Sequence, residues 1–155
     1  MKINDLVFGE LELSSMWQKE EKVLFLSTEY GIKLFVEGSE SDEFTDTQRQ
    51  AYKEFHNNYD KILPEIECAI LKYYQSVFEE YRDMYEDEAD NYAPHVNEFS
   101  QLKGFIKPQS IVIANAGSER VINYLFKTKW DLEYGLGIRL VNEKVVVVGI
   151  QNDVL

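Results

Sequence analysis

The chain has few of the residues that build covalent or metal-based frameworks. It contains one cysteine, Cys68, two histidines and three prolines among its 155 residues. A single cysteine excludes an internal disulfide and favours a reducing compartment, and we expect Cys68 to be buried as a small hydrophobic residue. Neither His56 nor His95 has a second histidine or a cysteine at metal-site spacing, so both are expected to be structural or solvated. We therefore expect no catalytic residue, no cofactor and no metal site.

Long apolar runs are also missing. No stretch approaches the about 18 apolar residues of a membrane span, and the first residues lack the apolar run and cleavage site of a secretory signal. We expect a cytoplasmic protein that does not bind a membrane. Hydrophobic residues nevertheless make up 45% of the chain and aromatic residues 14%. This composition supplies a core for a single domain over residues 1–155.

Basic residues are scarce in the middle of the chain, where the negative charge is concentrated. Residues 37–98 hold seventeen acidic and five basic residues, a net charge of −12, while the flanking segments together hold eleven of each. Such a block attracts cationic partners and repels nucleic acid and anionic membranes. We expect a basic protein partner and no nucleic acid.

Residues 3–36 show the apolar patterns of strands. Residues 3–13 alternate imperfectly, and the break near Gly9 is interpreted as a bulge. Two further apolar runs, residues 23–26 and 32–36, flank a turn predicted at residues 29–31, where Gly31 offers a positive φ. The pattern predicts three N-terminal strands.

The apolar period then changes to that of helices. Thr45 and Gln48 have the spacing of a capping box, and an apolar stripe follows at helical intervals. Pro64 is expected to end this helix or to open the next, whose stripe continues to Met84. Residues 86–94 are predicted to form a mobile loop, and residues 96–104 a short helix.

Four strands are predicted after the helices, over residues 110–114, 121–130, 136–141 and 144–150, the last two joined by a hairpin at Asn142-Glu143. The predicted fold class is α+β: a mainly antiparallel curved sheet of three N-terminal and four C-terminal strands, with two or three helices inserted in the middle and packed on one face. The pattern leaves one sheet or two open; we favour one strongly curved sheet.

Aromatic residues beside the densest acidic run point to a binding surface. Interface cores with polar rims combine aromatic anchors with surrounding charge. The candidate partner-binding residues are Tyr85, Glu86, Asp87, Glu88, Asp90 and Tyr92. The alternative is a solvated helix face that serves solubility. Acid pairs such as Glu79 and Asp83 also occur at helical spacing, without the pattern of a calcium site.

Three basic residues near the C-terminus, Lys127, Lys129 and Arg139, alternate with residues predicted to be inside. We expect them to share the outer face of the last strands. They are too few for a nucleic-acid site, and a role in protecting the sheet from aggregation is favoured.

The C-terminal sequence resembles a known family. It runs Trp130-Asp131-Leu132-Glu133-Tyr134-Gly135-Leu136-Gly137-Ile138 and continues through residues 141–151. It is similar to the ending of a family of uncharacterised bacterial proteins with a domain of unknown function, whose members also carry segments like Phe8-Gly9-Glu10-Leu11 and Gln48-x-x-Ala51-Tyr52-x-x-Phe55. The resemblance implies an α+β cytoplasmic bacterial protein, in a class that includes candidate toxin-immunity proteins. Physically, Gly135 and Gly137 are expected to permit positive φ at a tight corner.

Three functions follow from these observations. The first is a non-enzymatic acidic protein-binding module, an immunity-type inhibitor of a basic bacterial toxin, with charge complementarity raising its association rate. The second is a structural or regulatory module that acts as a homo-oligomer. The third and least favoured is a metal-dependent enzyme built on the acidic cluster.

Overall fold

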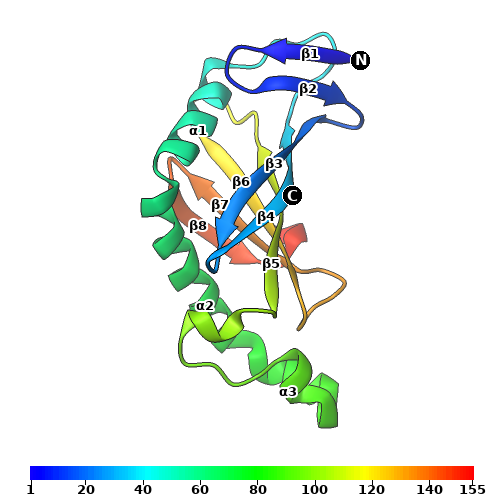
Figure 1. Cartoon of the computed structure of the whole chain (residues 1–155), viewed down its shortest axis with the longest axis vertical. Helices are drawn as coiled ribbons and strands as arrows, with labels where there is room; N and C mark the ends of the chain where they lie inside the picture. The colour runs from blue at the N-terminus through cyan, green and yellow to red at the C-terminus, as the bar shows by residue number, and fades with distance from the viewer.

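The computed structural model describes residues 1–155 and contains one eight-stranded sheet whose strand order follows the chain order (Figure 1). The strands are β1 (Lys2–Asp5), β2 (Gly9–Leu13), β3 (Trp17–Phe25), β4 (Thr28–Val36), β5 (Ile106–Ile113), β6 (Val121–Thr128), β7 (Leu136–Val141) and β8 (Lys144–Gly149). Every neighbouring pair is antiparallel except β4 and β5. The α+β class and the mainly antiparallel sheet are confirmed, in one sheet with four strands rather than three before the helices.

The additional strand arises from a turn after Asp5. The Asp5 carboxylate accepts hydrogen bonds from the backbone N–H groups of Val7 at 2.9 Å and Phe8 at 3.1 Å. This reverses the chain, and Gly9 follows with a φ of +79°. An Asp that bonds backbone groups two and three residues ahead is a common turn former. The bulge predicted near Gly9 is therefore wrong, because residues 3–13 form a hairpin.

The turn between β3 and β4 also differs from the prediction. Leu26 and Ser27 adopt φ values of 49° and 61° and make the turn. Gly31 lies within β4, opposite Lys22 of β3. An apolar residue such as Leu26 is unusual at positive φ, which explains why the glycine was the better sequence signal.

The helices lie in the connection between β4 and β5. They are α1 (Asp46–Asn57) and α2 (Tyr59–Tyr85), followed by the short helices η1 (Glu86–Glu88), α3 (Ala89–Tyr92) and η2 (Phe99–Leu102). β4 and β5 are parallel. Parallel neighbours need a long crossover, and the helical connection supplies it. Residues 86–94, predicted as a loop, are largely helical.

The predicted capping box at the start of α1 is confirmed. The Gln48 N–H donates to Thr45 Oγ1 and the Thr45 N–H donates to Gln48 Oε1, each at 3.0 Å. The prediction for Pro64 is wrong, because the break between the helices falls at Asn58 and Pro64 lies inside α2.

The hairpin between β7 and β8 is as predicted. Asn142 and Glu143 adopt φ values of 49° and 66°, the left-handed pair that a two-residue hairpin requires. The Asn142 side chain accepts a hydrogen bond from the Arg120 N–H, which ties the hairpin to the start of β6.

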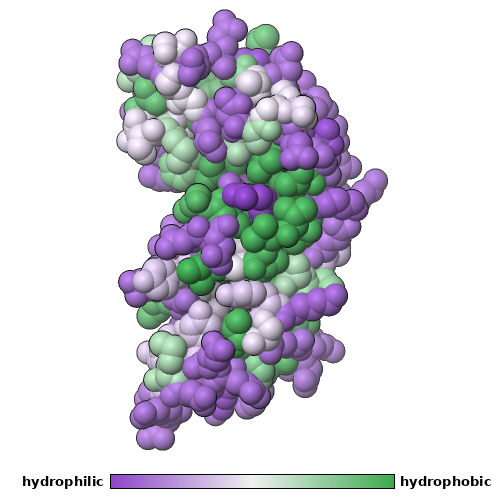
Figure 2. Space-filling view, turned by 180° about the vertical axis from the view of Figure 1, so that it is seen from behind, coloured by the Kyte–Doolittle hydropathy of each residue, from purple (hydrophilic) through white to green (hydrophobic).

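Both long helices pack on the same side of the sheet and leave the opposite side, here called the open face, without a helical layer (Figure 1). In the view from behind, hydrophobic residues gather around a hollow at mid-height on the side away from the helices, with a strongly hydrophilic spot among them (Figure 2). The helices thus cover one face only, as the single apolar stripe of each helix predicts.

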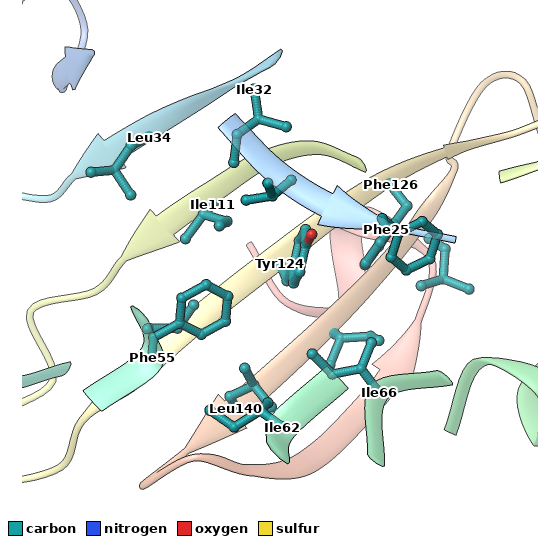
Figure 3. Close-up of a cluster of buried hydrophobic side chains, with 14 of the residues drawn as sticks. Phe25, Ile32, Leu34, Phe55, Ile62, Ile66, Ile111, Tyr124, Phe126 and Leu140 are labelled. Atoms are coloured by element: carbon teal, nitrogen blue, oxygen red, sulfur yellow. The ribbon is translucent and has the colours of Figure 1, made fainter. Parts of the chain in front are cut away.

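The main core lies between the helices and the covered face of the sheet. Figure 3 shows Phe55 of α1 and Ile62 and Ile66 of α2 beside Tyr124 and Phe126 of β6. All five side chains are at most 4% exposed. Burying an isoleucine or phenylalanine stabilises a fold by about 1.5–3 kcal/mol, so this cluster holds the helical layer on the sheet.

A short C-terminal turn covers part of the open face. This turn, η3 (Gln151–Asp153), packs against β7 and β8 and leads into Val154, which is 1% exposed. A Cβ atom at Gly137 would lie 2.6 Å from Val154 Cγ2, which is closer than real Cβ contacts come. Gly135 has the predicted positive φ of 57°, but Gly137 does not. The expectation of a positive φ at Gly137 is therefore wrong. Glycine is required there because a side chain would collide with Val154.

Candidate functional site

The C-terminal end of α2 extends beyond the sheet. Its buried residues, Ile62, Ile66, Ile70 and Tyr74, repeat every four positions and end at Tyr74. Figure 1 shows the rest of α2 and α3 projecting past the sheet, and Met84, predicted to continue the stripe, is 71% exposed. We call residues 79–92 the acidic tip.

The acidic tip is attached to the sheet by tyrosines. Tyr81 donates its hydroxyl hydrogen to Asp131 Oδ2 at 2.7 Å, and Tyr85 donates to the Trp130 carbonyl at 2.9 Å. Burial, together with the hydrogen bond to Asp131, raises the pKa of Tyr81. Burial also raises the pKa of Tyr85. Both hydroxyls are thus donors well above neutral pH and hold the tip against the loop between β6 and β7.

A second set of bonds holds the short helices of the tip against α2. Arg82 Nη1 donates to Asp90 Oδ1 and to the Ala93 carbonyl, each at 2.9 Å. Asn91 donates to Glu88 Oε2 at 2.7 Å. Glu86 ends α2 with a φ of 50° and a ψ of −116°, an unusual conformation for a residue other than glycine. These hydrogen bonds fix the short helices of the tip relative to α2.

The structure brings the six predicted partner-binding residues together on this tip. Glu86, Asp87, Glu88 and Asp90 are exposed, whereas Tyr85 and Tyr92 are half-buried. The two tyrosine rings stack with their centroids 4.6 Å apart and 18° between their planes. Tyr85 also has a structural role, because its hydroxyl bonds the Trp130 carbonyl.

Seven acidic side chains of the tip are exposed: Glu79, Glu80, Asp83, Glu86, Asp87, Glu88 and Asp90. Among these, Asp90 alone forms an ion pair, with Arg82. Like charges at helical spacing repel each other by a few tenths of a kcal/mol per pair. The tip is therefore a surface whose negative charge is unpaired except at Asp90. No group of three or more His, Cys, Asp or Glu side chains in the molecule is arranged to hold a metal ion.

The remaining sequence candidates lie elsewhere. His56 Nε2 is 3.2 Å from Glu21 Oε2 at the contact between α1 and β3. His95 is exposed and packs edge-on against Phe78. Cys68 is exposed, so its predicted burial is wrong: position 68 falls between Ile66 and Ile70 and points away from their buried side of α2.

Glu21 is held by contacts from α1. Tyr52 donates to Glu21 Oε1 at 2.5 Å, and Lys19 Nζ lies 3.7 Å from the same oxygen. Burial raises the pKa of Glu21, but the contacts with His56 and Tyr52 outweigh burial and lower it. A largely buried carboxylate, 13% exposed, with three polar partners makes a structural link between helix and sheet.

Sequence reasoning missed a cavity on the open face. It has a volume of about 780 Å³ and thirteen lining residues, eight of them hydrophobic. The polar residues of its lining are Arg139, Asn123, Glu37 and Glu119. Alternation predicts that Arg139 lies on an outer face. The cavity could not be predicted, because it forms where β5 to β7 meet the segment after β4 and the C-terminal residues.

Residues 7–155 match a protein family described as a domain of unknown function (DUF6985). The chain belongs to this family. The DUF6985 match includes both the acidic tip and the open-face cavity and confirms the resemblance to a family of unknown function. No curated protein and no solved structure shows significant similarity to the chain. No helix of this DUF6985 protein combines the length and hydrophobicity that a membrane span requires.

Proposed function

We propose that this DUF6985 protein is a non-enzymatic protein-binding module whose acidic tip binds a basic protein partner. The observation that carries the proposal is the set of seven exposed carboxylates at the tip, six of them without an ion pair. A basic surface would relieve their mutual repulsion on docking. Opposite charge also speeds encounter above the usual range of about 10⁵ to 10⁶ M⁻¹s⁻¹.

The aromatic pair at the tip supports the same function. Tyr85 and Tyr92 stack on each other while remaining partly exposed. Tyrosines surrounded by charge are frequent anchors at the centre of interfaces. The hydrogen bond from Tyr85 to the Trp130 carbonyl, and the stacking of Tyr92 on Tyr85, order the surface before binding, which lowers the entropy cost of association.

A finer proposal follows from the family resemblance. The protein acts in the bacterial cytoplasm as an immunity-type inhibitor, and its basic partner is a toxin whose active site the acidic tip covers. A toxin that acts on an anionic substrate such as nucleic acid has a basic active site. The acidic tip carries the same negative charge as such a substrate and would occupy the site in its place.

Self-association through β8 is the second candidate function. β8 is an edge strand of the sheet with four consecutive valines, and Val146 is 55% exposed. α2 packs against β8, but no strand pairs with its outer side. An edge strand without a strand partner can pair with a strand of another copy. A structural or regulatory homo-oligomer would therefore form through β8. Light scattering on the purified protein distinguishes the two, because the tip-binding function needs no oligomer.

Partner capture with matched variants tests the first proposal. The test variant carries E86K, D87K and E88K at the tip. The control carries E12K, E40K and E43K, which change the same charge at three exposed acids that form no ion pair and lie outside the tip. We expect the wild type and the control to retain a basic protein from the native host and the tip variant to lose it. Equal retention by both variants would contradict the proposal.

A further inference from the structure

One arginine on the open face differs from the other three in the chain. Arg49, Arg82 and Arg120 each pair with a carboxylate at 2.8 to 2.9 Å. Arg139 takes part in no ion pair, in a protein with 28 acidic residues. Its guanidinium is half-buried, where an unpaired charge is costly.

The position of Arg139 follows from the strand register. Phe35, Val112, Asn123, Arg139 and Val147 pair in sequence across β4 to β8. Paired residues of neighbouring strands point to the same face of a sheet. The Arg139 side chain therefore lies in a row of paired residues on the side away from the helices. Asn123 is the only other polar residue of that row.

Two neutral acceptors orient the guanidinium. Arg139 Nε donates to Asn123 Oδ1 at 3.1 Å, and Nη2 donates to the Val154 carbonyl at 2.7 Å. Asn123 is 4% exposed and Val154 is 1% exposed, so both partners are fixed by packing. The Nη1 group donates to no protein atom. The side chain is thus held in place with donors left for an additional acceptor.

The surrounding cavity selects the kind of acceptor. Its volume of about 780 Å³ lies within the range of small-molecule sites. Its apolar walls are aliphatic, including Met16, Val121 and Val141, and no aromatic ring lines it. Glu37 and Glu119 also line the cavity and disfavour anions of high charge, such as phosphates.

We propose that the open-face cavity binds a small aliphatic monocarboxylate, with the carboxylate on Arg139 and the hydrocarbon chain along the aliphatic walls. A guanidinium offers a carboxylate two parallel hydrogen bonds, and a single charge neutralises it. This site is separate from the acidic tip and goes beyond the protein-binding function proposed above.

Calorimetry with octanoate tests the site. We expect saturable one-to-one binding by the wild type, weakened about tenfold or more in Arg139→Gln because a charge-assisted hydrogen bond is lost. Lys127→Gln is the matched control, since Lys127 is exposed on β6 and does not line the cavity. It should bind octanoate as the wild type does. Octanamide, which has the same chain without the charge, should bind about tenfold more weakly than octanoate.

Nuclear magnetic resonance on the wild type gives a readout that does not depend on any variant. Octanoate should shift the amide resonances of Val112, Val121 and Val154 and leave those of the acidic tip unchanged. Several results would overturn the proposal: no saturable binding of octanoate, equal binding of octanamide, or undiminished binding by Arg139→Gln. A dimer that covers these amides and excludes octanoate would also overturn it, as would tighter binding of inorganic phosphate.

Discussion

Trp130 follows β6 where the loop to β7 begins, and its indole ring packs against Tyr74 with centroids 4.7 Å apart. It is 1% exposed. Replacing it with alanine should lower the free energy of unfolding by about 3–5 kcal/mol, as expected for the loss of a buried indole. Chemical denaturation measures this change. An unchanged denaturation midpoint would mean that the side chain contributes no packing energy.

A second residue-scale prediction concerns the carboxylate that joins β3 to α1. Because folding lowers the pKa of Glu21, its ionisation stabilises the fold above the ordinary glutamate value of 4.5, and this stabilisation is lost as the pH falls through the lower, folded-state value. We expect the free energy of unfolding to decrease below about pH 4.5, and to decrease less steeply in Glu21→Gln. Denaturation across a pH series would show this, and parallel curves for both proteins would contradict it.

At the scale of elements, the packing of the C-terminal turn η3 depends on the absence of a side chain at Gly137. Ala at position 137 would place its Cβ 2.6 Å from Val154 Cγ2 and 3.2 Å from the Gln151 Cα. We expect Gly137→Ala to destabilise the fold by about 1–3 kcal/mol through overpacking and to displace η3. Gly31→Ala is the control, because its Cβ would meet no atom within 4 Å. Equal stability of the two variants would contradict this account.

The sequence predicted elements wherever a local signal agreed with the tertiary structure. The capping box at Thr45 and the hairpin at Asn142 are local, and both are confirmed. The first hairpin differs from the prediction because the break in alternation near Gly9 indicates a bulge, whereas the Asp5 carboxylate forms a turn there. The turn at Leu26 has no local signal, since an apolar residue adopts positive φ there only in the context of the folded sheet.

In the candidate sites, too, some features could be predicted from the local sequence and others depend on the tertiary structure. The exposure of the acidic residues of the tip could be predicted from the sequence, because dense charge is exposed in almost any fold, whether it lies on a helix or in a loop. The attachment of Tyr85 to Trp130 joins residues 45 positions apart, and composition carries no trace of it. The absence of an ion pair at Arg139 likewise depends on which carboxylates the folded chain brings near it, and the sequence alone does not give those neighbours.

At the scale of the whole molecule, the charge is distributed unevenly over the surface. One sheet carries both helices on one face, and α2 takes the acidic residues beyond the sheet at one end (Figure 1). The tip therefore presents its negative charge away from the rest of the protein, where it is accessible to the basic partner that we propose. Exposed charge of this kind acts on the rate of encounter more than on the lifetime of a complex.

The most direct test of this account is the association rate of the captured partner, measured by surface plasmon resonance over a series of salt concentrations. The wild type and the E12K/E40K/E43K control should associate rapidly, with rates that fall as salt increases. The E86K/D87K/E88K variant should associate at least tenfold more slowly at low salt and show a nearly flat salt dependence. If this variant keeps the wild-type association rate and salt dependence, the acidic tip is not the binding surface.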